Sequence, residues 1–400
     1  MSNDGFLDED SPRKHFEDMA RRIDPALMRL PHPKRLVLSG ATEMLRLALG
    51  DLYDETFRAL SDVHATKGII IERLSRFAKF REWIQVSRDA PATYNLGSLD
   101  ISLTEMRYRA LQGRIFQIRD SLDSRLRETD IGADAPCQFL RSPFPSVFLE
   151  IGTERRSPYT VSNTESGLHI LEGAYVTEAS VVWPYDDATT PLMSALGVSR
   201  GTPCRVLEIV LIGSPLGKNG LLDDSTLFMN LVIPEDREDR PLAEVLEQHF
   251  QVFRQYLSNM PDYRPLATHE ENELRIGIVH IAKILLYLHS ENHVTQNYPA
   301  ESTLGERVAR VSERKRAKLK RRIMREYDRV IVGPEELPEA TPAGKADESG
   351  RNVATHWRRG HFHYYLVGPG RQQRKLMFIN PVLVNAKEIG AAPARNYDIK

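Results

Sequence analysis

Histidine and arginine side chains gather near the end of the chain, in the segment HWRRGHFHYYLVGPGRQQRKLMFINPVLVN at residues 356–385. No Asp or Glu occurs from Arg351 to Lys387, so nothing inside this segment neutralises its cations. The chain as a whole, by contrast, has a formal net charge of -1. We therefore expect a local positive field here, of the kind that attracts RNA phosphates or an acidic partner.

The same segment has the pattern of a β-hairpin. Residues 360–367 are rich in aromatic and β-branched types, the following Gly-Pro-Gly is turn chemistry, and an apolar run resumes at 375–384. Alternation with a period of two places His361, His363 and Tyr365 on one face. Phe362, Tyr364 and Leu366 share the other face, which we expect to pack against a core.

The exposed face then combines imidazole, aromatic and guanidinium groups, which suit single-stranded RNA. The residues predicted to contact RNA or the ribosome are His356, Trp357, Arg358, Arg359, His361, His363, Tyr365, Arg371, Arg374 and Lys375.

Two chemical alternatives use the same histidines. His361 and His363 could serve as acid and base of a metal-independent ribonuclease, and with His356 they could ligate a metal. The second alternative is disfavoured because no carboxylate accompanies the histidines and the nearby arginines oppose a dication. We predict no metal, no cofactor and a role in binding; the ribonuclease stays open as an alternative.

A second basic region lies at residues 297–332. Its apolar positions keep a helical spacing, so a docked basic helix or a helical arm would both fit. So many like charges on one helix repel one another, which favours an anionic partner over a merely solvated face. The predicted second patch comprises Arg314, Lys315, Arg316, Lys318, Arg321, Arg322 and Arg325.

The rest of the chain predicts an α+β fold, with an N-terminal helical region and a central antiparallel or mixed sheet backed by long helices. Helical spacing occurs at 13–30, 41–64, 67–88 and 98–126, and strand patterns at 146–151, 159–162, 168–183, 204–212 and 226–233. Long amphipathic or apolar helices follow at 241–257 and 270–290. The predicted divisions are a disordered tail (1–12), a helical domain (13–130), a sheet-plus-helices domain (137–295), a basic helical segment (297–332), a flexible linker (333–352) and a C-terminal hairpin module (353–400).

Several functional classes find no support. The loop IGSPLGKNGLL lacks the spacing of a phosphate-binding loop and leads into a strand, and no Gly-x-Ser-x-Gly or HExxH motif occurs. The N-terminus has no apolar signal region and no stretch is long and apolar enough to cross a bilayer. We expect a cytoplasmic protein with no membrane contact.

The motif RRGHFHYYLVGPGRQQRKLMFINPVLVN resembles the C-terminal signature of the second type V-A anti-CRISPR family. Weaker similarity runs through ERLSRFAKFREW, PSVFLEIG, GAYVTEA and the stretch from FMNLVIPED to LAEVLEQ. The longer N-terminus and the Tyr364-Tyr365 pair depart from the family pattern. The matching positions are Arg358, Arg359, Gly360, His361, Phe362, His363, Gly368, Gly370, Pro381 and Asn385.

This resemblance implies a protein of a phage, plasmid or other mobile element that acts inside the host bacterial cell. It implies recognition of the nascent N-terminal peptide of a type V-A Cas effector, coupled to loss of the message being translated. The implied partners are that peptide and the ribosome or mRNA. An RNA- or ribosome-binding protein with a different target is the alternative, and no residue is assigned to the peptide.

Overall fold

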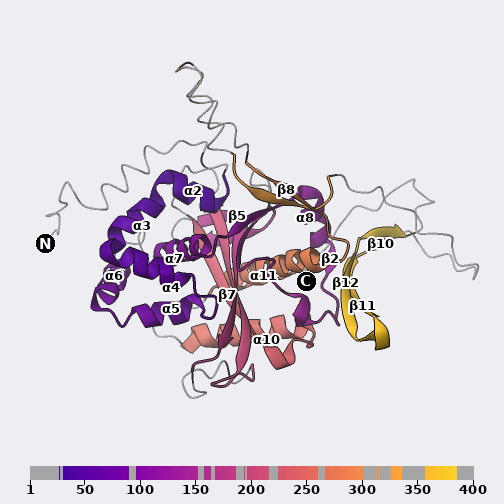
Figure 1. The fold of residues 1–400 in the computed structure, drawn as a ribbon. Helices are drawn as coiled ribbons and strands as arrows, with labels where there is room; N and C mark the ends of the chain where they lie inside the picture. Colours follow the sequence, from indigo (N-terminus) through magenta and orange to yellow (C-terminus); the bar gives the residue numbers. More distant parts are fainter. Residues whose placement is uncertain are drawn as a thin grey trace, which may run out of the picture.

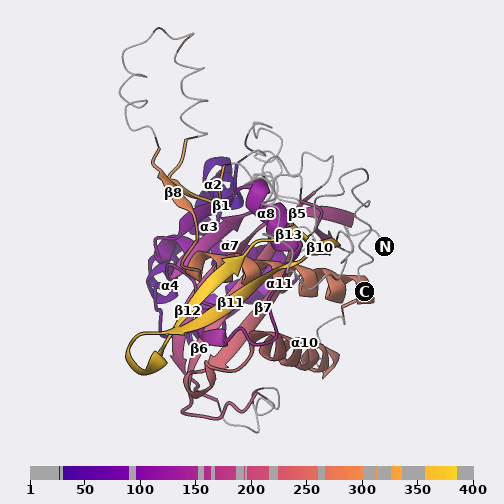
Figure 2. The same cartoon turned by 90° about the vertical axis from the view of Figure 1, so that its right-hand side faces the viewer.

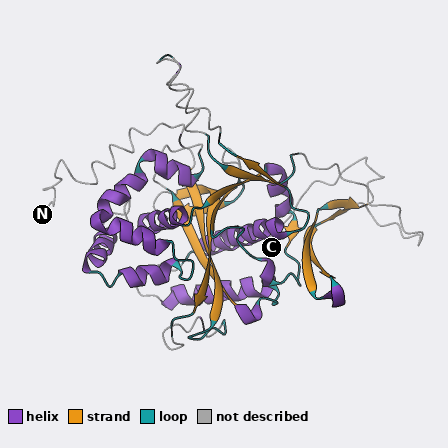
Figure 3. Cartoon of the chain, viewed as in Figure 1, coloured by secondary structure: helices purple, strands orange, loops and turns teal. Residues whose placement is uncertain are grey.

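The structure, a computed structural model, describes residues 27, 30–89, 96–151, 157–163, 167–185, 193, 196–215, 224–259, 266–300, 312, 315, 326–335 and 356–384. In this part of the chain, helices near the N-terminus lie on one side of a central sheet and two long helices lie on the other (Figure 1). A small sheet formed largely by the C-terminal hairpin stands beside them (Figure 3). The architecture is α+β, as predicted.

The N-terminal helices are shorter than their sequence pattern predicts. The helix predicted at 41–64 is interrupted at Gly50, whose backbone (φ 53, ψ -124) is not helical, and the one predicted at 67–88 breaks at residues 75–77. The helix predicted at 13–30 lies almost entirely outside the described residues. The observed elements are α2 (His32–Ser39), α3 (Ala41–Leu49), the 3-10 turn η2 (Gly50–Leu52), α4 (Tyr53–Leu60), α5 (Lys67–Leu74), α6 (Ala78–Asp89) and α7 (Leu96–Ala110).

The single helix predicted at 98–126 is wrong. After α7 the chain turns at Gln112, which has a left-handed φ of 53, and at Gly113, where a Cβ would lie 2.2 Å from the Tyr108 ring. Ile115 and Phe116 are both buried although they point to opposite faces, as in a covered strand. The elements here are β1 (Arg114–Ile118), α8 (Asp120–Arg127) and β2 (Thr129–Asp130).

The central sheet has eight strands and is mixed. β1 pairs in parallel with β3 and β9, whereas the other pairings are antiparallel. The order is β7-β6-β5-β3-β1-β9-β8, with β4 also pairing with β5. The remaining strands are β3 (Ser146–Glu150), β4 (Thr160–Asn163), β5 (Gly167–Val182), β6 (Pro203–Pro215), β7 (Ser225–Pro234), β8 (Thr295–Tyr298) and β9 (Arg329–Val332).

Two of these strands correct the prediction for residues 297–332. That segment was expected to be a basic helix, but its two ends form the second half of β8 and all of β9, which pair with each other. Strand β9 is apolar (RVIV), and Val332 is fully buried beside β1. Sheet pairing therefore overrides helical propensity at both ends of the segment.

Strand β6 explains how both faces of the sheet are covered. Leu207, Ile209 and Leu211 pack in a cluster with α10 (Leu242–Asn259) and α11 (Thr268–His289). The side chain of Val206 points to the opposite face of β6 and packs with the N-terminal helices. Helix α11 is buried along most of its length, as its apolar sequence predicts.

The C-terminal hairpin is present as predicted, but its second strand is divided. Strand β12 ends before Asn380-Pro381, and the chain beyond pairs with β10. The remaining elements are η4 (Cys137–Phe139), η6 (Glu235–Arg237), β10 (His356–Arg358), β11 (Gly360–Val367), η7 (Pro369–Arg371), β12 (Gln373–Ile379) and β13 (Val382–Val384). The predicted tail at 1–12 and most of the predicted linker at 333–352 lie outside the described residues.

Within the described ranges, no helix combines the length and the apolar character needed to cross a membrane.

Candidate functional site

The C-terminal hairpin is fixed to the central domain through the face that was predicted to be buried. Phe362, Leu376 and Phe378 are almost fully buried in the main core. The Phe378 ring lies 5.3 Å from the Phe362 ring and 5.4 Å from that of Tyr287 on α11, measured between centroids. The hairpin is therefore part of the central domain's core and its opposite face is held in place.

The turn that follows α11 adds hydrogen bonds to this contact. The Asn292 side chain donates to the Phe378 carbonyl at 2.8 Å and accepts from the Phe378 amide at 3.0 Å. The Glu291 amide donates to the Leu376 carbonyl at 2.9 Å. These three bonds pair backbone groups of Leu376 and Phe378 on the outer edge of β12, where no neighbouring strand supplies partners.

Two glycines of the motif have structural roles. A Cβ at Gly360 would lie 2.5 Å from the Thr129 hydroxyl oxygen and 2.9 Å from the Ile379 carbonyl oxygen, so only glycine allows β11 to approach β2. Gly368, at the turn, has a φ of 81 that favours glycine. This part of the motif serves the fold.

The exposed face of the hairpin carries the predicted histidines. The His363 ring meets Tyr365 edge-on, with 4.6 Å between their centroids, and Tyr365 is 44% exposed. His361 is half-buried, and Met377 and Lys375 lie across from His363 and Tyr365 on β12. Neighbouring side chains on this face form an imidazole and phenol surface with apolar flanks, which can stack on an unpaired base.

Carboxylates from outside the hairpin engage two of its predicted cations. Arg359 lies 3.2 Å from a carboxylate oxygen of Asp130, and Lys375 lies 3.0 Å from one of Glu291. Residues 351–387 contain no acidic residue, but the fold places Asp130 and Glu291 beside the hairpin. Both pairs are exposed and therefore weak, so a phosphate can compete for these cations.

The other cations of the hairpin differ in exposure. Arg358 and Arg371 are exposed, and the half-buried Arg374 places its guanidinium 5.7 Å from the Tyr364 ring centroid. The backbone of His356 and Trp357 is paired with β13, while their side chains lie outside what the structure describes. The predicted residues whose side chains the structure describes therefore lie at the junction of β10 and β11, on β11 and β12, and in the turn between these two strands.

Most of the second basic patch lies outside the described residues. Of its seven members only Lys315 is described, and it is exposed. The two ends of the segment meet at β8 and β9, where the Ala300 amide donates to Asp328 at 2.8 Å. There the Arg329 guanidinium lies 4.1 Å from the ring centroid of Tyr298 and 4.9 Å from that of Tyr327.

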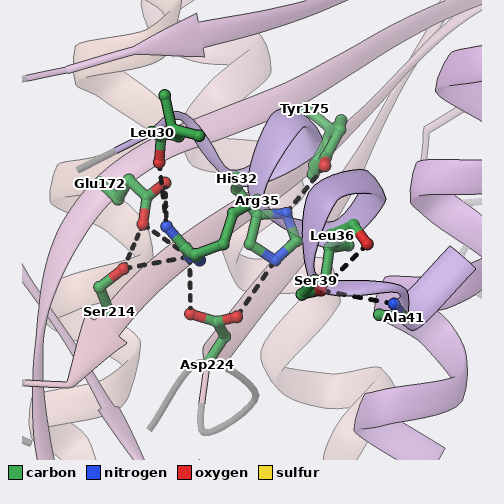
Figure 4. Close-up of polar contacts among 10 residues, drawn as sticks. All are labelled: Leu30, His32, Arg35, Leu36, Ser39, Ala41, Glu172, Tyr175, Ser214 and Asp224. Atoms are coloured by element: carbon green, nitrogen blue, oxygen red, sulfur yellow. Dashed lines mark hydrogen bonds and ion pairs between the residues drawn. The ribbon is translucent and has the colours of Figure 1, made fainter. Parts of the chain in front are cut away.

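A buried ionic cluster that the sequence did not predict joins α2 to the sheet (Figure 4). Arg35 is fully buried and donates at 2.9 Å both to Glu172 on β5 and to Asp224 just before β7. His32 Nδ1 lies 2.8 Å from the Tyr175 hydroxyl, and its Nε2 lies 3.2 Å from Asp224. Arg35 is 137 residues from Glu172 and 189 from Asp224 in the sequence, so no local spacing could have indicated these contacts.

Electrostatics around this cluster shift the pKa of several groups. Burial lowers the pKa of Arg35, but Glu172 and Asp224 raise it more, so the guanidinium stays charged. Burial and the charge of Glu172 raise the pKa of Glu150 from 4.5 to about 7, although the Tyr327 hydroxyl donates to this carboxylate at 3.2 Å. The cluster links α2 to the sheet, and the pKa of about 7 belongs to Glu150, a neighbouring carboxyl group outside the cluster.

Among the described residues, no group of three or more His, Cys, Asp or Glu side chains is arranged to hold a metal ion. His361 and His363 lie two residues apart on one strand, and the ring contacts of His363 are with Tyr364 and Tyr365.

Together these features define an α+β protein in which a mixed sheet carries a basic, aromatic hairpin fixed to its core. The model of the anti-CRISPR type V subtype A2 (AcrVA2-like) family matches residues 116–386, more than half of the chain, and the chain belongs to this family. The match includes the C-terminal motif, so the resemblance predicted from that motif is confirmed. Membership implies a target related to Cas12a, the type V-A effector nuclease.

The crystal structure of AcrVA2 is similar to this chain, with a TM-score of 0.44 and 13% sequence identity, over 86% of this chain and 98% of that one. No curated protein sequence matches the chain.

Proposed function

We propose that this protein inhibits type V-A CRISPR immunity during translation of the effector nuclease. It binds the nascent N-terminal peptide of the effector, attaches to the ribosome or mRNA, and so lowers the amount of effector message and protein. Family membership supports the anti-CRISPR role. The observation that carries the attachment to RNA is the exposed histidine and tyrosine face of a hairpin whose other face is locked in the core.

The chemistry of this face favours RNA. His363 and Tyr365 offer ring surfaces for unpaired bases, while Arg358 and Arg371 project charge without a carboxylate partner among the described side chains. Because Phe362 anchors the strand, little ordering entropy is lost when a nucleotide binds. Phosphate contacts supply affinity, and the rings favour single strands over duplex.

The experiment that tests this function co-expresses the protein with a type V-A effector from an unrelated promoter and measures effector protein and mRNA. The proposal expects both to fall. A matched effector gene with synonymous codons throughout should respond equally, whereas one whose first codons encode a different peptide should not respond. Unchanged levels of the unmodified effector would refute the proposal for that effector.

Variants separate RNA attachment from folding. Arg358→Ala with Arg371→Ala should weaken ribosome co-sedimentation and reduce its dependence on salt concentration, as the loss of two phosphate contacts predicts. The matched control, Arg58→Ala with Arg76→Ala, removes two exposed cations from the helical region. Equal effects of the two pairs would mean that net charge, and not the hairpin, controls attachment.

The same experiments decide between the proposal and its alternatives. Co-sedimentation with ribosomes without loss of the effector would indicate an RNA-binding protein with another target. Cleavage of RNA by the purified protein, abolished by His361→Ala or His363→Ala, would indicate the ribonuclease.

A further inference from the structure

The hairpin of β11 and β12 extends beyond the part that packs against the core. No residue between Phe362 and Leu376 is buried, and Leu366 is 51% exposed although it alternates in phase with Phe362. Figure 1 and Figure 2 both show the turn of this hairpin at the margin of the molecule. The hairpin tip, residues 365–375, therefore has two free faces.

The two faces of the hairpin tip have the same chemical composition. Leu366 lies across from Arg374 on the face that continues from Phe362, and Tyr365 lies across from Lys375 on the other face. Paired side chains of an antiparallel ribbon are close neighbours on one face. Each face therefore places one apolar surface beside one cation.

The cations of the tip are available to an anion. Arg371 is exposed at the turn, and among the described side chains no carboxylate forms an ion pair with Arg371 or Arg374. The Arg374 guanidinium contacts the Tyr364 ring, which orients it without neutralising its charge. Lys375 has an exposed and therefore weak pair with Glu291. Both faces of the tip thus complement the charge of phosphate.

We propose that the hairpin tip is a wedge that separates the two strands at the end of an RNA duplex and holds one strand on each face. Leucine and proline are side chains that proteins insert between stacked bases, and Leu366 and Pro369 are both exposed at the tip. The released bases contact Leu366 on one face and Tyr365 on the other, while the neighbouring cations contact phosphate. This inference rests on the proposed attachment to RNA and adds a second face and a second strand to it.

The anchored part of the hairpin allows the tip to act on a base pair. Phe362 and Phe378 are buried with 5.3 Å between their ring centroids, and the Asn292 side chain binds both the amide and the carbonyl of Phe378. Because the strands are already ordered, contacts with the released bases can offset the loss of the pair. Binding alone drives this opening, so it is limited to the end of the duplex and needs no nucleotide hydrolysis.

A forked RNA tests the wedge. The probe is a short duplex with two single-stranded arms and a fluorescent adenine analogue in its terminal base pair, where unstacking raises the fluorescence. We expect saturating full-length protein, without added nucleotide, to raise the signal of this probe. The same analogue in the middle of the duplex should give no change.

Leu366→Ala removes the apolar group of one face and keeps the surface formed by His363 and Tyr365. We expect this variant to bind a single-stranded RNA within about twofold of wild type, to bind the fork at least about fivefold more weakly, and to lose the fluorescence increase. Leu366→Phe, with a larger apolar surface, should keep the increase. Leu47→Ala, at a 61% exposed leucine on α3, is the matched control and should behave as wild type. Circular dichroism and thermal unfolding establish that the variants fold.

The outcomes separate this inference from the function beneath it. A wild-type protein that binds neither RNA refutes the wedge together with the proposed attachment to RNA. Binding of single strands without a rise in fork fluorescence, or a rise that Leu366→Ala leaves intact, refutes the wedge and leaves that attachment standing. If Leu366 instead joins two copies of the chain, ultracentrifugation will show a dimer that Leu366→Ala dissociates without a change in fork fluorescence, and the inference fails.

Discussion

Replacing Glu150 by Gln should change how the stability of the protein depends on pH. The folded protein raises the pKa of this carboxyl from 4.5 to about 7, chiefly through burial and the nearby Glu172. A carboxyl with a raised pKa keeps its proton to higher pH in the folded chain than in the unfolded chain. The free energy of unfolding therefore falls as pH rises from about 4.5 through 7, and the loss is complete above that range.

The size of this loss follows from the two pKa values. Their difference, at 1.36 kcal/mol for each pKa unit, corresponds to about 3 kcal/mol. Glu150 is partly exposed, so solvent screening reduces the expected loss to about 1–3 kcal/mol. Gln resembles the protonated carboxyl in shape and can still accept from the Tyr327 hydroxyl.

Urea unfolding at pH 5, 6, 7 and 8 measures the effect. We expect the wild-type protein to lose stability across this range, and the Gln variant to lose less and to be the more stable of the two at pH 8. Glu43→Gln, at an exposed carboxylate paired with Arg46, controls for the removal of a surface charge. Parallel curves for wild type and Glu150→Gln would show that this carboxyl does not titrate near neutrality.

Two further substitutions test the packing described above. Phe362→Ala should destabilise the protein by about 3–5 kcal/mol in urea unfolding, because the ring is buried in the main core. Tyr365→Ala, on the opposite face and 44% exposed, should have a much smaller effect; equal effects would mean that the hairpin faces are reversed. Arg35→Met should lower the free energy of unfolding by about 3–5 kcal/mol at pH 7, because it leaves the buried carboxylates of Glu172 and Asp224 without their cation. The loss should be smaller at low pH, where the carboxylates are protonated. A loss no larger than that caused by Lys34→Met would refute this role of Arg35.

The sequence predicted elements that turn residues delimit and that pair locally. Strand patterns at 204–212 and 226–233 correspond to β6 and β7, and the hairpin and the burial of Phe362 were both predicted correctly. Leu366, predicted on the same packed face, is instead 51% exposed because it lies near the turn, beyond the contact with the core. Strand β1 was missed because its five residues follow a helix after a tight turn, and its partners β3 and β9 are remote in sequence. Parallel pairing leaves no local signal of the kind that a hairpin turn provides.

The candidate site shows the same division between local and distant information. Alternation along β11 was enough to place His361 and His363 on the exposed face. The carboxylates of Asp130 and Glu291, which pair with the hairpin's cations, come from distant parts of the chain and could not be predicted. The contacts between Arg35 and its acidic partners were missed for the same reason.

The position of β9 has a consequence for the synthesis of this protein. β9 lies between β1 and β8, although 210 residues (119–328) separate its first residue, Arg329, from the end of β1 at Ile118. Until Val332 has left the ribosome, the side of β1 that will pair with β9 has no partner strand. β2 remains without its partner until β11 has also been synthesised. The inhibitor therefore completes its own fold only after nearly all of it has been translated, and its N-terminal half must stay soluble with an open sheet edge until then.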